Sequence, residues 1–411
     1  MSEFADNFGP MPIDGFQGTN PEFVDVKTAY YFMLDELRDA VGKLDVTVTN
    51  PPDLQKYDKA YGFDYMKWKK YGNAMRLRLA MRISEVDAAK AKQEFEAAAS
   101  SDLLLEWNET FKVAELPGWD PLSGVRTREW NQMPLSATIN NLFVGLCGIP
   151  SADQLPAEFH DSIKPADYMG IRYEDHWGAF TNDPYAGFWL DGLPYSIDPR
   201  AYKCFIIPGW FDNPNFCFYG NATTTKRKLL GVNGTDLVVD AAITWNAACL
   251  GNWGPKASKN QLIGFDGAQP RLGQQFRNNA NERVFFAPWE TYFLLAEAAI
   301  KGWTTPVDAK TAYEAGILSS LNYWGVGQFY NDYIASESYN RVGTSVKWDH
   351  TTEPPETVSM NYINGYTGET GTWVMKYPAN ALHGDNKNDH LTKVITQNYI
   401  AQNPWLPLEA G

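Results

Sequence analysis

The chain has 411 residues and a formal net charge of −14 at pH 7, with 49 acidic residues against 35 basic ones. This balance argues against nucleic acid and anionic membrane surfaces as partners, because both reward Lys and Arg. Hydrophobic residues make up 44% and charged residues 20%, so we expect a globular protein with an ample core. Aromatic residues reach 14%, and rings beyond the needs of a core favour flat binding surfaces.

Two early helices are predicted by apolar stripes at helical spacing. The first covers 26–44 and has Asp25 as its expected N-cap; the second covers 64–83. A short turn then reaches Asp87, a second expected N-cap, and an Ala-rich helix follows over 88–99. A long helix, a short turn and a small-residue partner are typical of tetratricopeptide-like (TPR-like) hairpins.

A further helical hairpin is predicted between residues 289 and 325. Apolar residues recur at helical spacing from Trp289, Gly302 stands where a helix usually stops, and Pro306 restarts the chain. A last helix is expected over 391–402, after an irregular stretch at 337–389. Stacked hairpins build scaffolds that hold loops out for binding, so this pattern favours recognition over catalysis.

The predicted fold is mainly α: TPR-like helical hairpins form a scaffold that carries a large loop-rich insertion with short strands. We expect a single domain over 1–411, with its scaffold mainly at 25–100, 288–335 and 390–402. Gly, Pro, Asn and Trp are dense over 101–287, where short β-prone runs appear, such as those at 204–210 and 236–245. Loops on a rigid scaffold commonly carry binding residues, so 101–287 is the expected ligand-binding region.

Catalytic, cofactor and membrane patterns are missing from the sequence. It has no G-x-S-x-G, H-E-x-x-H, P-loop or dinucleotide motif, no EF-hand spacing, and no apolar run of the roughly 18–20 residues that a membrane span needs. The first residues lack a signal peptide, so the chain is either cytosolic or the mature or truncated form of an exported protein. We expect no enzyme activity, no cofactor and no metal site.

The cysteines and the paired carboxylates give little support for a metal site, a disulfide scaffold or a catalytic site. Cys147, Cys204, Cys217 and Cys249 lack C-x-x-C spacing, and we expect buried thiols. Two carboxylates on either side of a glycosidic bond could make a glycosidase. With 49 acidic residues in the chain, however, neighbouring carboxylates are expected by chance. Glu297 lies on a helix predicted to be packed, so we expect it to form an internal hydrogen bond. The candidate carboxylates are Glu174 with Asp175, Asp183 with Asp191, and Glu297.

The sharpest constellation is a set of aromatic residues interleaved with Asn and Asp in the loop-rich region. A ring face can cover the apolar face of a sugar, and neighbouring amides or carboxylates can satisfy its hydroxyls. The alternative is that most of these rings fill gaps between loops. The predicted ligand-binding residues are first Trp245, Asn246 and Trp253, then Trp177, Trp189, Trp210 and Tyr219.

Several motifs together resemble those of the SusD/RagB family. FGPMPI at 8–13 is similar to that family's Phe-Gly-x-x-Pro segment, and WKKYGNAMRLRLAMRIS at 68–84 is similar to its Trp-x-x-x-x-Asn-x-x-x-Leu-Arg-x-Ala-x-Arg-Ile signature. KVITQNYIA at 393–401 resembles its Thr-Gln-Lys-x-Ile-Ala segment, with Asn398 in place of the usual Lys. These motifs are spread over nearly the whole chain.

The resemblance implies a surface-exposed outer-membrane lipoprotein of Bacteroidetes that binds an oligosaccharide or polysaccharide without breaking a bond. It would close over a SusC-like TonB-dependent transporter. The family normally has a lipobox Cys and further helices before the Phe-Gly-x-x-Pro point, and relatives continue beyond this C-terminus. We therefore expect a chain clipped at both ends, with its lipid anchor in the full-length precursor. A peptide ligand, as for some relatives, is the main alternative, and a glycoside hydrolase is a weaker one.

Overall fold

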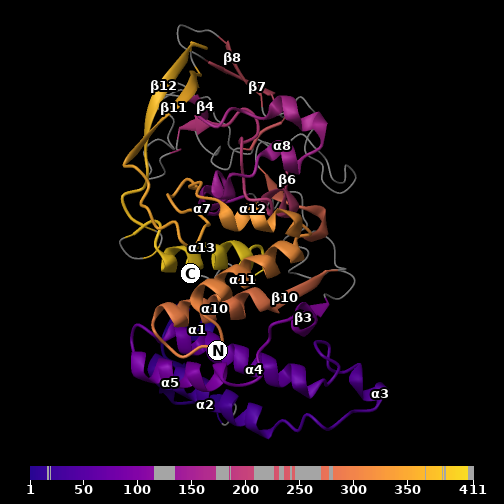
Figure 1. Ribbon diagram of the computed structural model, residues 1–411. Helices are drawn as coiled ribbons and strands as arrows, with labels where there is room; N and C mark the ends of the chain where they lie inside the picture. Colours follow the sequence, from indigo (N-terminus) through magenta and orange to yellow (C-terminus); the bar gives the residue numbers. More distant parts are fainter. Residues whose placement is uncertain are drawn as a thin grey trace. The chain divides into compact units, whose positions relative to one another are not determined.

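Figure 1 shows the computed structural model of the chain. It divides into two compact units. The first is Met1–Ala114, Glu282–Ser320 and Ala401–Gly411; the second is Glu115–Asn281 and Leu321–Ile400. The described residues are 1–15, 18, 20–114, 135–172, 185, 187–207, 226–230, 236–240, 243–245, 270–276, 281–365, 367–381, 383 and 386–405.

The early helices of the first unit confirm the sequence prediction. Each N-cap aspartate accepts a backbone hydrogen bond three residues on: Asp25 from Thr28, Asp64 from Lys67, and Asp87 from Lys90. The helices of this unit are α1 Ser2–Phe8, α2 Val26–Lys43, α3 Pro52–Gln55, α4 Tyr65–Arg82, α5 Ala88–Ala99 and α10 Pro288–Ile300. Its strands are β1 Met11–Pro12 with β2 Phe23–Val24, and β3 Phe111–Ala114 with β10 Glu282–Phe286.

Helix α4 is the centre of the first unit and packs against α2, α5 and α10. At its crossing with α2, a Cβ added to Gly72 would lie 2.5 Å from Val41 Cγ2, so a small residue is required there. On another face of α4, the buried Arg78 guanidinium donates to both carboxylate oxygens of Glu290 on α10, at 2.5 and 2.7 Å. Apolar packing and a buried ion pair together fix α4.

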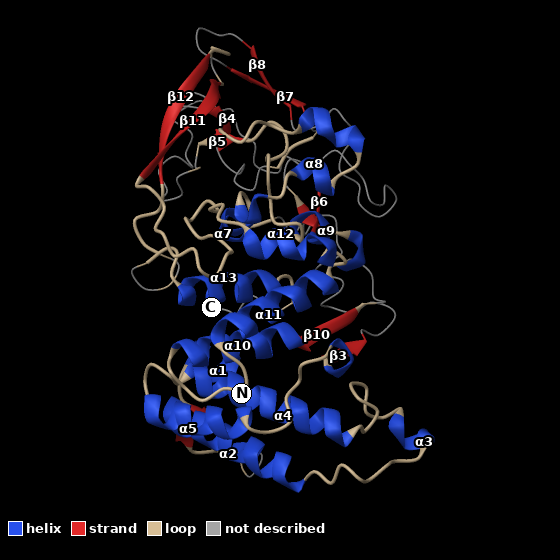
Figure 2. Ribbon diagram, in the orientation of Figure 1, coloured by secondary structure: helices blue, strands red, loops and turns tan. Residues whose placement is uncertain are grey.

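The predicted hairpin at 289–325 is confirmed as α10 and α11 Ala309–Tyr323 (Figure 2). Gly302 has φ +73°, and the backbone N–H of Trp303 donates to the carbonyl of Ala298, as in a Schellman C-cap. Gly316 of α11 lies against the ring of Phe293 on α10, where an added Cβ would be 2.7 Å from a ring carbon. The small residue lets the two helices pack closely.

The second unit contains a four-stranded sheet with the order β12-β11-β4-β5. β11 Thr357–Asn364 and β12 Thr370–Lys376 form an antiparallel hairpin, β4 Tyr168–Arg172 pairs in parallel with β11, and β5 Phe188–Trp189 pairs antiparallel with β4. The hairpin lies in the stretch at 337–389 that we expected to be irregular, so that expectation was wrong. Exposed and partly buried residues alternate along β11, which is the period of a strand.

The second unit has short elements within 101–287, as the sequence predicted for the insertion, and further helices outside that range. Strands β6 Phe205–Ile206 and β8 Asp236–Asp240 fall in the two β-prone runs; they pair with β9 Arg271–Leu272 and β7 Lys226–Leu230. The helices are α7 Ala137–Phe143, α8 Ser151–Gln154, α9 Ala201–Cys204, α12 Tyr330–Ala335 and α13 His390–Gln402, with α11 and α13 crossing the boundary between the units. The mainly helical fold is confirmed.

A buried polar network joins three segments of the second unit. The Arg200 guanidinium donates to Asp198 at 2.6 Å, to the Tyr333 hydroxyl of α12 at 2.6 Å and to Gln397 of α13 at 2.9 Å. All four side chains are almost fully buried. Because each charge has a hydrogen-bonded partner, the network can hold these segments without an unpaired buried charge.

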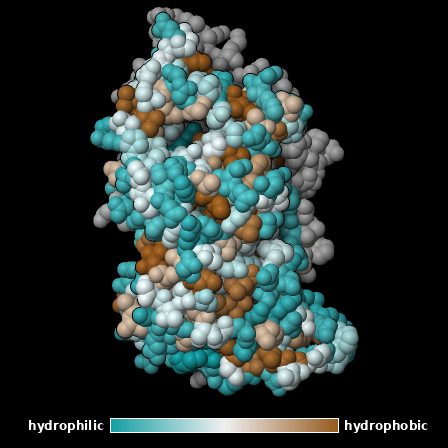
Figure 3. Space-filling model, in the orientation of Figure 1, coloured by the Kyte–Doolittle hydropathy of each residue, from teal (hydrophilic) through white to brown (hydrophobic). Residues whose placement is uncertain are grey.

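The described surface is mainly hydrophilic on the face drawn in Figure 3, where hydrophobic residues occur in small separate patches. Of the helices that the structure describes, none combines the length and apolar character needed to cross a membrane. Cys147 and Cys204 are buried, as expected, while Cys217 and Cys249 lie outside the described residues.

Candidate ligand-binding site

Two of the predicted sugar-stacking residues lie in the interior of the second unit. Trp189 on β5 is 0% exposed and Trp245 is 1% exposed. The Trp245 Nε1 donates to Asn140 Oδ1 at 3.0 Å, and its ring meets Tyr202 edge to face at 5.1 Å. Neither Trp offers an open ring face in this structure, so the prediction for these two residues is corrected: they are packing residues. Trp177, Trp210, Tyr219, Asn246 and Trp253 lie outside the described residues.

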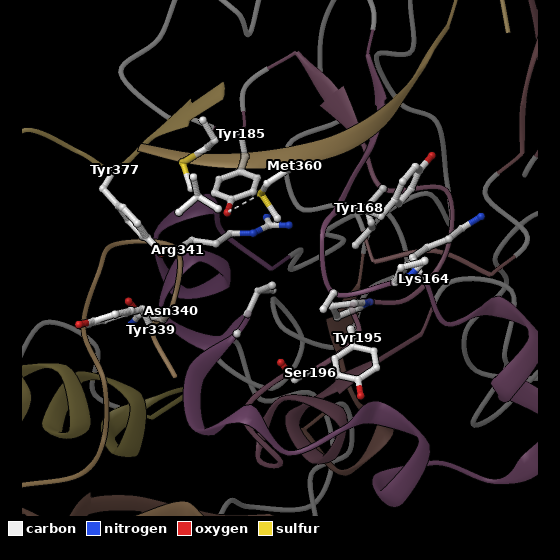
Figure 4. A pocket seen from close by; sticks show the side chains of 18 residues that line it. Lys164, Tyr168, Tyr185, Tyr195, Ser196, Tyr339, Asn340, Arg341, Met360 and Tyr377 are labelled. Atoms are coloured by element: carbon white, nitrogen blue, oxygen red, sulfur yellow. Dashed lines mark hydrogen bonds between the residues drawn. The ribbon is translucent and has the colours of Figure 1, made fainter. Parts of the chain in front are cut away.

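The second unit instead contains a cavity of about 220 Å³, which we call the tyrosine cavity (Figure 4). Its lining comes from five separate parts of the chain and includes five tyrosines, two cationic side chains and several apolar ones. The lining residues are Val144, Gly145, Lys164, Pro165, Ala166, Tyr168, Tyr185, Leu190, Pro194, Tyr195, Ser196, Tyr339, Asn340, Arg341, Val358, Met360, Met375 and Tyr377.

One wall of the tyrosine cavity is a cluster of aromatic, sulfur and guanidinium groups. The Arg341 guanidinium carbon lies 3.8 Å from the centroid of the Tyr185 ring, and the Tyr185 hydroxyl is 3.9 Å from the Met360 sulfur. Tyr339 and Tyr377 meet nearly edge to face, with centroids 6.4 Å apart. Figure 4 shows the Arg341 guanidinium beside the Tyr185 ring, directed towards the middle of the cavity. This wall offers ring faces and charged N–H donors together.

The segment that carries Arg341 is held by its own turn. Asn340 is buried; its Oδ1 accepts backbone N–H bonds from Val342 and Thr344, at 3.1 and 2.9 Å. The Arg341 backbone N–H donates to the carbonyl of Asn141 at 3.1 Å. On the other side of the turn, Gly145 has φ +81°, and an added Cβ would lie 2.8 Å from the Tyr339 carbonyl oxygen. The backbone therefore fixes the position of Arg341 before any ligand arrives.

The opposite wall contains Lys164, Tyr168, Tyr195 and Ser196 (Figure 4). The Lys164 ammonium lies 5.4 Å from the Tyr168 ring centroid and 3.1 Å from Asp191 Oδ2. Tyr195 is 46% exposed, which leaves much of its side chain open to a ligand. This wall is more accessible than the first.

The phenol groups of the first wall stay protonated at neutral pH. Burial raises the pKa of Tyr377 to about 12, with a further contribution from the neighbouring tyrosines. Burial likewise raises the pKa of Tyr339, helped by the negative charges of Glu353 and Glu337. A neutral phenol both donates and accepts hydrogen bonds, so the tyrosines can satisfy the hydroxyls of a ligand.

The described carboxylates suggested for a glycosidase have structural partners. Asp191 pairs with Lys164, and Glu297 on α10 lies 3.9 Å from Lys301 one turn further along the chain. Glu174, Asp175 and Asp183 lie outside the described residues. In the described part of the chain, no group of three His, Cys, Asp or Glu side chains is placed to hold a metal ion. The tyrosine cavity is suited to binding by stacking and hydrogen bonds.

The chain belongs to the SusD/RagB family. Its sequence matches the family described as "SusD-like: Susd and RagB outer membrane lipoprotein" over residues 1–176 and 268–409. The family is one of non-catalytic binding proteins, and its description places its members at the outer membrane. All seven predicted ligand-binding residues fall between the two matched segments. The family match therefore supplies no counterpart for any of them.

Solved structures of the family share the fold. A SusD homologue from Parabacteroides distasonis is 24% identical with a TM-score of 0.64, and the match covers 99% of this chain and 64% of that one. A chitin-binding SusD homologue from Flavobacterium johnsoniae is 21% identical with a TM-score of 0.59, covering 100% and 64%. The chain thus spans about two thirds of the length of these relatives. No curated protein matches it.

Most residues of the tyrosine cavity could not be recognised from the sequence. Tyr168, Tyr195, Tyr339, Arg341 and Tyr377 are not among the predicted ligand-binding residues. Tyr195 and Tyr339 are more than 140 positions apart in the sequence, and such distant residues meet only when the chain folds. A usable sign was the Tyr-Asn-Arg run at 339–341, which places an aromatic, an amide and a cation together in a loop.

Proposed function

We propose that this protein binds an oligosaccharide or polysaccharide in the tyrosine cavity and does so without catalysis. Membership of the SusD/RagB family supports binding as the activity, and the relative from Flavobacterium johnsoniae is itself a chitin-binding protein. The observation that carries the proposal is the cavity itself, with five tyrosines, a stacked arginine and no carboxylate among its described lining residues.

The binding mechanism follows from the groups on the two walls. A sugar ring has apolar C–H faces that stack on phenol rings, while its hydroxyls exchange hydrogen bonds with the tyrosines and Ser196. The cavity volume of about 220 Å³ is below the roughly 300–1,000 Å³ of pockets that enclose a whole drug-sized ligand. We therefore expect it to take one end or a short stretch of a longer glycan, with an affinity of roughly 4–8 kcal/mol.

Delivery to a transporter is the second part of the proposal. The family description as an outer-membrane lipoprotein supports a surface location for the full-length precursor, where a SusC-like TonB-dependent transporter would receive the glycan. Co-purification of the tagged precursor with such a transporter from outer membranes tests this part. Recovery of the precursor alone under mild detergent would contradict it.

The binding site is tested by a glycan array followed by titration calorimetry on Tyr195→Ala. Tyr195 is half exposed, so its removal should leave the fold intact and weaken glycan binding about tenfold or more. Tyr57→Ala is the matched control, because Tyr57 is 68% exposed and belongs to the first unit. Equal affinity for the wild type and both variants would contradict the proposed site.

Two further measurements separate the proposed function from its alternatives. A peptide that displaces the bound glycan from the wild type, and binds more weakly to Tyr195→Ala, would favour the peptide-binding alternative. Sustained release of reducing sugar from the glycan would contradict a purely binding role. We expect neither competition nor turnover.

A further inference from the structure

A fully buried lysine is hydrogen-bonded to the turn that carries one wall of the tyrosine cavity. Lys393 on α13 is 0% exposed. Its ammonium donates to the Ser345 carbonyl at 2.6 Å, to the Ser345 hydroxyl at 2.8 Å and to Asn388 Oδ1 at 2.7 Å. An ammonium has three N–H donors, so these acceptors use all of them. None of the described carboxylates forms an ion pair with Lys393.

A chain of hydrogen bonds leads from this lysine to a tyrosine of the cavity. The Ser345 hydroxyl lies 2.8 Å from His350 Nδ1, and His350 Nε2 lies 3.5 Å from the Tyr339 hydroxyl. The Tyr339 hydroxyl donates to the Thr352 carbonyl at 2.8 Å. Because the Ser345 hydroxyl accepts from the ammonium, its own proton is available for His350 Nδ1, and His350 can donate through Nε2 to Tyr339. The proton on Lys393 therefore sets the direction of the bonds up to the cavity wall.

The same lysine also holds the backbone of the turn. Asn388 Oδ1, which accepts from the Lys393 ammonium, accepts the Ser345 backbone N–H at 2.8 Å as well. The Asn388 side-chain nitrogen donates to the Thr352 carbonyl at 2.7 Å. Residues 339–341, a few positions before Ser345, line the cavity. A change at Lys393 can therefore reach the cavity through the backbone and through the side chains.

The charge of Lys393 is sensitive to pH near neutrality. Burial lowers the pKa of its ammonium to about 7, although the negative charges of Asp389 and Glu353 favour the charged form. Of the neighbouring titratable side chains, His350 is the one that the described hydrogen bonds link to it, through Ser345. The other charged or titratable groups on the segments that contact the ammonium are Lys347, Asp349, Lys387 and His390.

A neutral amine does not support the same pattern of bonds. It has two N–H donors for three acceptors, and its lone pair can accept the proton of the Ser345 hydroxyl. The hydroxyl then no longer donates to His350, and the link to Tyr339 loses its direction. The turn is held less firmly, so a ligand that binds against Tyr339 has to order it at a cost in affinity.

We propose that Lys393 is a positioning residue for the tyrosine cavity, which binds its glycan more tightly when the Lys393 amine is protonated and holds the turn in place. This inference rests on the proposed function, because it concerns the same cavity. By linkage, glycan binding draws a proton onto Lys393 to the same extent that the proton strengthens binding. The affinity for an uncharged glycan then depends on pH.

Titration calorimetry of the wild type tests the inference. The probes are chitotetraose and the other uncharged oligosaccharides of the glycan array that bind the wild type. We expect the affinity to fall about fourfold between pH 6 and pH 8.5, within the usual range of coupling between two sites. Binding at pH 7 should take up about a third of a proton per glycan, measured in buffers of different ionisation enthalpy.

A neutral variant assigns the pH dependence to Lys393. Lys393→Gln carries no charge at any pH and keeps two N–H donors, so it should bind as weakly as the wild type does at pH 8.5, at every pH and without proton uptake. Lys376→Gln is the matched control, because Lys376 is an exposed lysine of β12 and should leave the pH profile unchanged. A pH profile that persists in folded Lys393→Gln would overturn the role of Lys393.

The outcomes for the two proposals are distinct. Binding that takes up no proton and is independent of pH, but is weakened by Tyr195→Ala, would overturn the role of Lys393 and leave the proposed function standing. Absence of binding to every oligosaccharide of the array would overturn both. The proton uptake of the wild type needs no variant, so it decides the inference even if Lys393→Gln does not fold.

Discussion

Helix α4 in the first unit and the tyrosine cavity in the second unit are built in different ways. Helix α4 takes its cap, its apolar faces and its buried Arg78 from one continuous stretch of chain. The cavity takes Tyr168, Tyr195 and Arg341 from segments that are joined only by loops and a four-stranded sheet. Local periodicity specifies the helix, whereas the cavity depends on long-range pairing.

The residues that stabilise α4 differ from those that line the tyrosine cavity. Arg78 and Glu290 are buried and satisfy each other, so their charges contribute to holding α4 on α10. Arg341 and Tyr195 line a cavity and can change partners when a ligand enters. Substitutions in the first group should change the free energy of unfolding, and substitutions in the second group should change affinity.

The largest loss of stability is expected for Arg78→Ala. It leaves the buried Glu290 carboxylate without its main cation, which typically costs about 3–5 kcal/mol in free energy of unfolding. Chemical denaturation followed by circular dichroism measures the effect. Lys43→Ala, at an exposed helical pair with Asp39, is the control and should leave the midpoint unchanged. Similar shifts for both variants would contradict the role of the Arg78 pair.

Trp245→Ala should also destabilise the protein, by about 3–5 kcal/mol, because it empties a large buried volume. Trp245→Phe should cost less, about 1–3 kcal/mol, since it mainly leaves Asn140 Oδ1 without the indole donor. Thermal unfolding distinguishes the two. A fully stable Trp245→Ala with reduced glycan affinity would restore the sequence-based view that this ring binds sugar.

The pH dependence of stability should report on Glu297. Burial raises the pKa of this carboxyl to about 7 from its ordinary value of 4.5. The folded state then holds the proton more tightly, so the stabilisation is complete below about pH 4.5 and is lost as the pH rises to about 7. Glu297→Gln should add about 1–2 kcal/mol at pH 8 and little at pH 4. Equal unfolding midpoints for the variant and the wild type at pH 8 would contradict this assignment.

The smallest change in stability is expected for Tyr195→Ala. Its side chain is half exposed, so the free energy of unfolding should stay within about 0.5 kcal/mol of the wild type. Denaturation run beside the glycan titration provides the measurement. A large destabilisation would mean that any loss of affinity comes from unfolding and says nothing about the cavity.

Much of the helical frame could be predicted from the sequence because its determinants are local. Asp25 and Asp87 were expected as N-caps and act as such, and Gly302 ends α10 with a positive φ. The β11–β12 hairpin was not predicted from the sequence. Its strands alternate between exposed and more buried residues, but they lie among turn-rich segments, where a short alternation is hard to recognise.

The candidate site was harder to predict because aromatic residues serve both cores and binding surfaces. Trp189 and Trp245 were selected for their chemistry, but burial decided their role, and burial depends on distant segments. A Cβ added to Gly170 would lie 2.3 Å from the carbonyl oxygen of Trp189, a close approach that no local pattern indicates. The roles of the five predicted residues outside the described parts stay predictions.

The most direct test of the account is hydrogen exchange of the wild type with and without the glycan that binds best. If the glycan occupies the tyrosine cavity, the backbone amides of 193–196 and 339–343 should exchange more slowly in the complex, because these segments carry Tyr195 and Arg341. Protection confined to the first unit, or to residues 246–269 with no change in these two segments, would contradict the account.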